Sequence, residues 1–146
     1  MTWLFDLNVL IAVADPAHVF HDTVHNWLDR CAGDSWATCP LTENGFIRVL
    51  SQPKYRGGPF TPAEVITTLA AMKQASRLTH VFWPDSVSLS DSSLILPALI
   101  AGPSQVTDVY LATLALHHHA RLVTFDHSVA WQAVAGATPD LLLTLA

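Results

Sequence analysis

The chain has 146 residues, which predicts one domain spanning residues 1–146 with room for a substantial core. Hydrophobic residues make up 51% of the sequence and charged residues 13%, a balance that favours a deeply buried sheet. The net charge of −5 argues against sequence-independent nucleic-acid binding through a broad basic face.

Membrane insertion and export are not expected. The longest apolar stretch, residues 94–101, is too short to cross a bilayer, and the first residues lack the basic segment of a signal peptide. Cys31 and Cys39 match neither a disulfide framework nor a metal-binding spacing. We therefore expect reduced thiols in a cytoplasmic protein.

The first half of the chain alternates short apolar runs with segments of helical periodicity. These patterns predict, in order, a strand at residues 3–5, a helix at 8–14, an amphipathic helix at 21–31, a strand at 35–39 and a helix beginning at Pro40. The prolines and glycines of residues 52–60 predict a loop.

The second half continues this alternation. Residues 61–64, Thr-Pro-Ala-Glu, form a capping box, which predicts a helix from Pro62 to about Gln74. The remaining patterns predict a strand at 79–83, a helix from Asp91 or Ser92 to Gly102, a buried helix at 106–118, a strand at 121–125, a short helix at 127–134 and a strand at 140–145. Strands alternating with helices predict an α/β fold with a mostly parallel sheet of about five strands.

Four acidic residues follow predicted strands or open the helices after them. Asp6 and Asp126 come at the ends of strands, while Glu43 and Asp108 lie in the first turns of helices. Each residue alone has a structural explanation, as a helix cap or as a partner of the helix dipole, and for Asp6 alone capping and metal binding are equally well supported. All four positions belong to the carboxyl edge of the sheet, where open α/β folds bind ligands. Four carboxylates there predict a site for a divalent cation, since they cannot all stay ionised together without a compensating charge.

Neutral polar residues stand beside two of these acids. They are Asn8, Thr124 and Ser128, which either orient the carboxylates or cap local backbone. The segment after Glu43 carries three cationic residues, Arg48, Lys54 and Arg56. We interpret them either as contacts to phosphate groups or as a solvated helix end and loop.

The histidines at positions 18, 21 and 25 share one helix face if the helix predicted at 21–31 extends back to His18. Their spacing lacks the glutamate of a His-Glu-x-x-His zinc site, so we interpret them as surface or partly packed side chains. The sequence also lacks a Ser-His-Asp signature, a Cys-His signature and a glycine-rich phosphate loop.

The chain resembles the PIN-domain ribonucleases, and in particular the VapC toxins of type II toxin–antitoxin systems. The segments that carry this resemblance are residues 4–12, 36–51, 80–85, 105–115 and 121–126. The resemblance implies a three-layer α/β/α fold in which acids hold Mg²⁺ or Mn²⁺, with Asp6 and Asp108 as principal ligands and Glu43 and Asp126 completing the pocket. It also implies RNA cleavage, control by a cognate VapB-like antitoxin and a homodimer.

The expected reaction is hydrolysis of an RNA phosphodiester bond by metal-activated water, leaving a 5′-phosphate. Oxygen ligands suit Mg²⁺ and Mn²⁺. The main alternative is a non-catalytic RNA-binding or interaction module of the same fold. A phosphotransferase of the haloacid dehalogenase type would need a second aspartate where Asn8 stands, and a phospho-receiver would need a lysine later than Lys73.

Overall fold

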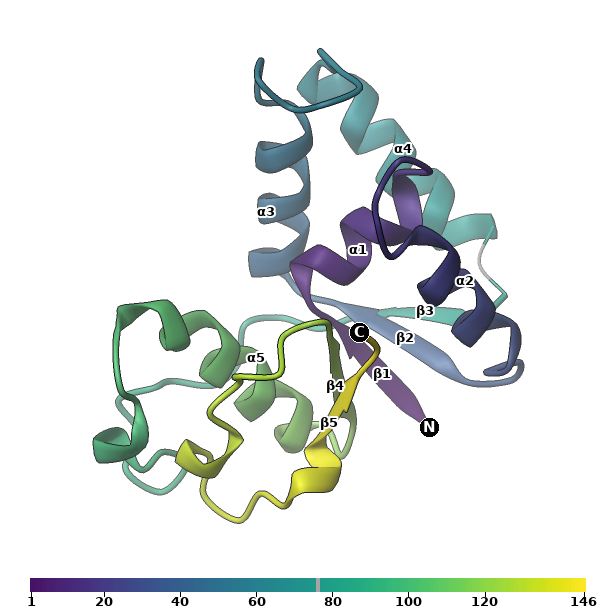
Figure 1. The fold of residues 1–146 in the computed structure, drawn as a ribbon. Coiled ribbons are helices and arrows are strands. Elements are labelled where there is room, and N and C mark those ends of the chain that lie inside the picture. The colour runs from purple at the N-terminus through teal and green to yellow at the C-terminus, as the bar shows by residue number, and fades with distance from the viewer. Residues whose placement is uncertain (76) are drawn as a thin grey trace.

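The core of the molecule is a sheet of five strands that all run parallel (Figure 1). The computed structural model describes residues 1–75 and 77–146. The strands lie side by side in the order β3-β2-β1-β4-β5. Their bounds are β1 Thr2–Phe5, β2 Ser35–Thr38, β3 Thr79–Phe82, β4 Arg121–Thr124 and β5 Leu142–Thr144. All five predicted strands are therefore confirmed.

In the described residues, five α-helices connect or flank these strands: α1 Leu7–Ala14, α2 His21–Asp29, α3 Pro40–Leu50, α4 Pro62–Ala75 and α5 Val106–His117. The predicted capping box is present at the start of α4. The Glu64 amide donates to the Thr61 hydroxyl at 3.1 Å, and the Thr61 amide donates to the Glu64 carboxylate at 3.2 Å. No helix in the described parts of the chain is long and apolar enough to cross a membrane.

Two of the predicted helices are wrong. Between residues 91 and 102 the chain forms turns and the 3₁₀ helix η1 (Pro97–Leu99), and between 127 and 134 it forms only η3 (Trp131–Ala133). The two segments instead pair with each other, through an antiparallel bridge between Ile95 and Val134. This non-local pairing takes the backbone groups that a helix would have used. Two further 3₁₀ helices, η2 (Pro103–Gln105) and η4 (Pro139–Leu141), precede α5 and β5.

Alternate residues of each strand face opposite layers. In β1, Trp3 and Phe5 pack in a cluster with side chains of α1, α2, α3 and α4, whereas Leu4 packs in a second cluster with α5 and the segment before it. Figure 1 shows the same division, with α1 to α4 on one face of the sheet and α5 on the other. The three-layer α/β/α arrangement is thus confirmed.

The strand order reverses at β1. The chain leaves β1 toward β2 and β3 on one side, and later returns to β4 and β5 on the other. In parallel sheets, the crevice outside the carboxyl ends of strands at such a reversal is where ligands bind. Because Asp6 follows β1 and Asp126 lies two residues after β4, both acids belong to this crevice.

Candidate active site

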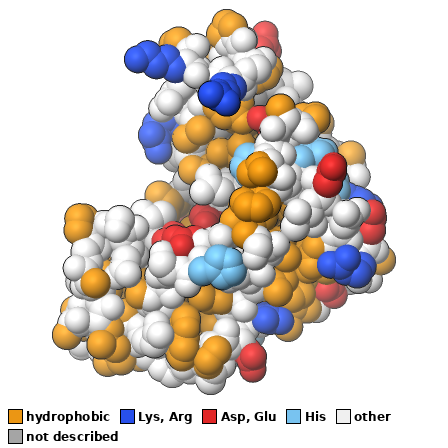
Figure 2. Space-filling view, viewed as in Figure 1, with side chains coloured by type: hydrophobic (Ala, Val, Ile, Leu, Met, Phe, Trp, Pro, Cys, Tyr) orange, Lys and Arg blue, Asp and Glu red, His pale blue; other side chains and the backbone are white. Residues whose placement is uncertain are grey.

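Three of the four predicted acids meet at the carboxyl ends of β1 and β4. The Asp6 amide donates to the Val123 carbonyl at 3.0 Å, which holds the end of β1 against β4. Asp108 lies in the first turn of α5, and the charges of Asp6 and Asp126 both raise its pKa. Figure 2 shows acidic side chains in a recess between the half of the molecule that carries α1 and α3 and the half that carries α5.

Asp6 combines a helix cap with a place in this cluster. Its Oδ1 accepts from the Leu7 amide at 2.7 Å, and its Oδ2 accepts from the Thr124 hydroxyl at 3.0 Å. Burial raises the pKa of Asp6 and the charge of Asp126 adds to this, although the two hydrogen bonds oppose the rise. Both oxygens of the Asp6 carboxylate are therefore oriented by hydrogen bonds, while no cationic side chain in the described residues compensates its negative charge.

The other two aspartates differ in how they are stabilised. Burial, followed by the charges of Asp6 and Asp126, raises the pKa of Asp108 to about 6. Asp126 is exposed, and hydrogen bonds from Ser128 lower its pKa. The Ser128 amide and hydroxyl both donate to Asp126 Oδ1, at 2.7 and 2.6 Å. Asn8 is exposed on α1, and its side chain makes no hydrogen bond within the described residues.

Glu43 lies in the first turn of α3 and is not among the charges that shift the pKa of the three aspartates. Its carboxylate accepts a hydrogen bond from Thr38 and forms an ion pair with Lys73, with Nζ 2.7 Å from Oε2. Across the described parts of the chain, no hydrogen bond or ion pair joins Glu43 to an aspartate of the cluster. Glu43 thus stands on the β2 side of β1, held by a cation from α4.

The sequence did not reveal the groups around Glu43. His80 Nε2 lies 2.8 Å from the Thr38 hydroxyl, and because that hydroxyl donates to Glu43, the imidazole is the donor of this second bond. Burial and the charge of Lys73 lower the pKa of His80, whereas Glu43 raises it. His80 comes beside these residues through the pairing of β2 with β3, a contact between strands that no local sequence pattern indicates.

The donor chemistry of the cluster fits a divalent cation. Asp6, Asp108 and Asp126 supply hard oxygen ligands, two of them have raised pKa values, and none is ion-paired to a lysine or arginine in the described residues. Within those residues, no three acidic, histidine or cysteine side chains are already arranged to enclose an ion. Magnesium keeps several waters beside one or two carboxylates, so this open arrangement suits it.

Two of the three histidines, His21 and His25, stabilise the end of a helix. Their rings donate to the carbonyls of Ala12 and Val13, at 2.7 and 2.9 Å, and so satisfy the carboxyl end of α1. Because α2 begins at His21, the condition under which His18 would share their helix face is not met.

The three predicted RNA-contacting cations are exposed near the far end of α3. Arg48 lies in the last turn of that helix, while Lys54 and Arg56 line a groove of about 520 Å³ in the following loop. Figure 2 shows Lys and Arg side chains at this end of the molecule, away from the acidic recess. The Tyr55 hydroxyl donates to Asp15 at 2.5 Å and ties the loop to the end of α1.

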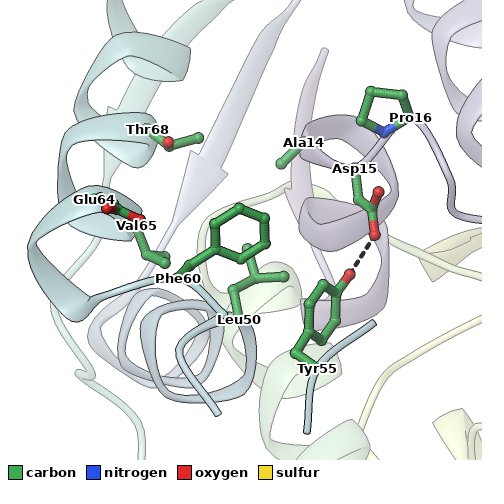
Figure 3. Close-up of a pocket in the computed structure, with 9 residues that line it drawn as sticks. All are labelled: Ala14, Asp15, Pro16, Leu50, Tyr55, Phe60, Glu64, Val65 and Thr68. Atoms are coloured by element: carbon green, nitrogen blue, oxygen red, sulfur yellow. Dashed lines mark hydrogen bonds between the residues drawn. The ribbon is translucent and has the colours of Figure 1, made fainter. Parts of the chain in front are cut away.

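That tether also borders a second cavity, of about 170 Å³, between α3 and α4 (Figure 3). Leu50, Phe60 and Val65 give this cavity an apolar wall, and Tyr55 points across its edge toward Asp15. It holds none of the four acids predicted for the metal site, so it is separate from the aspartate cluster.

Comparison with known proteins gives close relatives over nearly the full chain. The chain is 43% identical to Ribonuclease VapC44 of Mycobacterium tuberculosis over 145 residues, which cover 99% of this chain and 100% of the relative. It is 41% identical to Ribonuclease VapC39 of the same organism, covering 93% and 96% of the two chains. It is also 41% identical to Ribonuclease VapC38, covering 97% and 98%. No family model matches the chain.

A solved structure supports the fold. The crystal structure of VapBC2 from Rickettsia felis, bound to a DNA fragment from their promoter, matches with a TM-score of 0.60. The match covers 99% of this chain and 98% of that one, at 17% sequence identity, so it bears on the fold alone.

Proposed function

The chain belongs to the VapC family of ribonucleases, and from that premise we propose that it hydrolyses RNA at the aspartate cluster with a bound Mg²⁺ or Mn²⁺ ion. Membership makes it a ribonuclease toxin of a toxin–antitoxin system. The observation that carries the proposal is the meeting of Asp6, Asp108 and Asp126 at the reversal of strand order, with two raised pKa values. Such uncompensated negative charge is what a divalent cation stabilises.

Each residue of the cluster has a distinct part in this proposal. Asp6 and Asp108 are the principal ligands, and Asp126 completes the set from β4. Thr124 holds one Asp6 oxygen by donating to it, and Ser128 holds Asp126 in the same way. A bound ion would favour the ionised form of Asp108, because the pKa of about 6 is that of the ion-free site. When bound, the ion supplies stabilisation for the extra charge on the phosphate and a lower pKa for a water molecule.

Glu43 is proposed as the fourth acid of the site, approached from α3. In the structure its carboxylate is neutralised by Lys73 and oriented by Thr38. To become a direct ligand it has to exchange Lys73 for the ion. While Glu43 is paired with Lys73, it acts as a positioning group at the β2 side of the recess.

The remaining parts of the proposal concern the RNA, the protein partners and the location of the protein. Arg48, Lys54 and Arg56 contact phosphates of the RNA, which reconciles a net charge of −5 with a nucleic-acid substrate. Family membership supports a cognate VapB-like antitoxin, a homodimer and a cytoplasmic location, with residues 1–146 acting as one nuclease domain.

The test is cleavage of single-stranded RNA by the purified protein. We expect cleavage with Mg²⁺ or Mn²⁺, loss of cleavage with EDTA, recovery on adding the ion back, and products with 5′-phosphate ends. Binding of RNA without cleavage under any of these conditions would favour the alternative, a non-catalytic RNA-binding or interaction module of the same fold.

A further inference from the structure

Three aromatic rings gather around Phe125, the residue before Asp126. The ring centroids of Phe20 and Phe125 lie 4.6 Å apart, and the His18 centroid lies 5.9 Å from that of Phe125 and 6.0 Å from that of Phe20. The planes of His18 and Phe125 differ by 28°, and the Phe20 amide donates to His18 Nδ1 at 3.1 Å, which fixes the imidazole. All three residues are half-buried, so part of each side chain remains open to solvent.

This aromatic cluster connects two features that are otherwise separate. Phe125 directly precedes Asp126, so the backbone connects this aromatic cluster to the proposed metal site. His18 lines the same groove as Lys54 and Arg56. The rings are thus linked to the acids through residues 125 and 126, and to the exposed cations through a shared groove.

We propose that His18, Phe20 and Phe125 form a stacking surface for a base of single-stranded RNA, while Lys54 and Arg56 bind phosphates farther along the same strand. This inference rests on the proposed ribonuclease function and adds the way in which the substrate is held. Every base has a face that stacks on aromatic rings, and single-strand binders combine such rings with a basic groove. In a duplex the bases are stacked inside, so the surface selects unpaired RNA.

The geometry also explains how an acidic recess receives a polyanion. Stacking acts on the base and not on the phosphate. It therefore holds the strand beside Asp126 without requiring a positively charged side chain at that point. Lys54 and Arg56 share the groove with His18, and within the described residues neither forms an ion pair with an aspartate of the cluster. The stacking surface and the groove cations thus hold the strand together, and the aspartates stay free to bind the ion.

The test measures binding of a single-stranded RNA of about 12 nucleotides that carries 2-aminopurine, a length within the site sizes of single-strand binders. Asp108→Asn provides a full-length background that is expected not to cut the probe. Phe125→Leu in this background removes the ring but keeps apolar volume. Phe82→Leu is the matched control, because Phe82 is 50% exposed on β3, two strands away from β1.

We expect Phe125→Leu to weaken binding roughly ten-fold and to abolish the fluorescence quenching that stacking produces, with an unchanged salt dependence. Phe82→Leu should alter neither. Neutralising Lys54 and Arg56 should do the reverse, flattening the salt dependence while the bound probe stays quenched. His18→Leu is the second stacking variant, because it leaves Phe125, which packs against the core, in place.

Unchanged affinity and quenching in folded Phe125→Leu and His18→Leu proteins would overturn the inference. Lost neutralisation by the antitoxin, with RNA binding intact, would also overturn it and assign the surface to the protein partner. The proposed function is tested separately, because binding is read without cleavage. A wild-type protein that never cuts RNA, yet loses probe stacking in these variants, refutes the proposed function and supports the stacking surface.

Discussion

Replacing Asp108 by asparagine should stabilise the ion-free protein at neutral pH. The pKa of this carboxyl is about 6, because of burial and the charges of Asp6 and Asp126, against an ordinary value of 3.8. A difference of roughly two pH units corresponds to about 3 kcal/mol, which is an upper limit. Because the side chain is partly exposed, solvent screening reduces the expected gain to about 1–1.5 kcal/mol.

The pH dependence of this gain follows from the direction of the shift. Between about pH 4 and 6 the folded protein keeps the Asp108 proton that the unfolded chain has already lost, so the stability of the wild type falls as pH rises through this window. Above pH 6 the penalty is complete. The variant carries no charge to repel, so its advantage should be absent near pH 4 and full above pH 6.

Urea unfolding in EDTA, repeated between about pH 4 and 8, measures this difference. Asp140→Asn is the matched control, since Asp140 is an exposed acid outside the cluster. A variant that is less stable than wild type at neutral pH, or a gain that does not change with pH, would refute the reasoning that the three aspartates repel one another.

Three further predictions follow from the same geometry. Asp6→Asn should abolish RNA cleavage while thermal melting shows a folded protein, because asparagine still caps α1; full activity would remove Asp6 from the site. Neutralising Arg48, Lys54 and Arg56 should lower the slope of log affinity against log salt by about three if each binds a phosphate; an unchanged slope would show that these charges only solvate the loop. Lys73→Met should tighten Mn²⁺ binding about two- to five-fold in calorimetry. The substitution removes a cation that competes for Glu43 through an ion pair worth up to about 1 kcal/mol. Unchanged or weaker binding would contradict this.

Much of the fold could be predicted because its signals are local. The end of β1 and the start of α1 are marked by Asp6, a residue that favours caps, and the start of α4 by the Thr61–Glu64 capping box. The grouping of three aspartates was also predictable, because the carboxyl ends of parallel strands share one edge. These features need no knowledge of distant contacts.

The features that the sequence did not reveal depend on contacts between distant segments. The bridge between Ile95 and Val134 stands where two helices were expected, and neither segment indicates the other as its partner. The partner of Glu43 is Lys73, which lies on a different helix, and nothing near Glu43 in the sequence indicates it. The contact of His18 with Phe125 likewise joins the loop before α2 to the end of β4. Such pairings follow from tertiary packing and not from local propensity.

The central claim is that the aspartate cluster binds the ion that supports RNA hydrolysis. The most direct test is calorimetric Mn²⁺ binding to the wild type and to Asp108→Asn, with RNA cleavage measured on the same samples. We expect Mn²⁺ binding and cleavage in the wild type, and loss of both in a folded Asp108→Asn protein. Undiminished Mn²⁺ affinity in that variant, together with undiminished cleavage, would contradict the account.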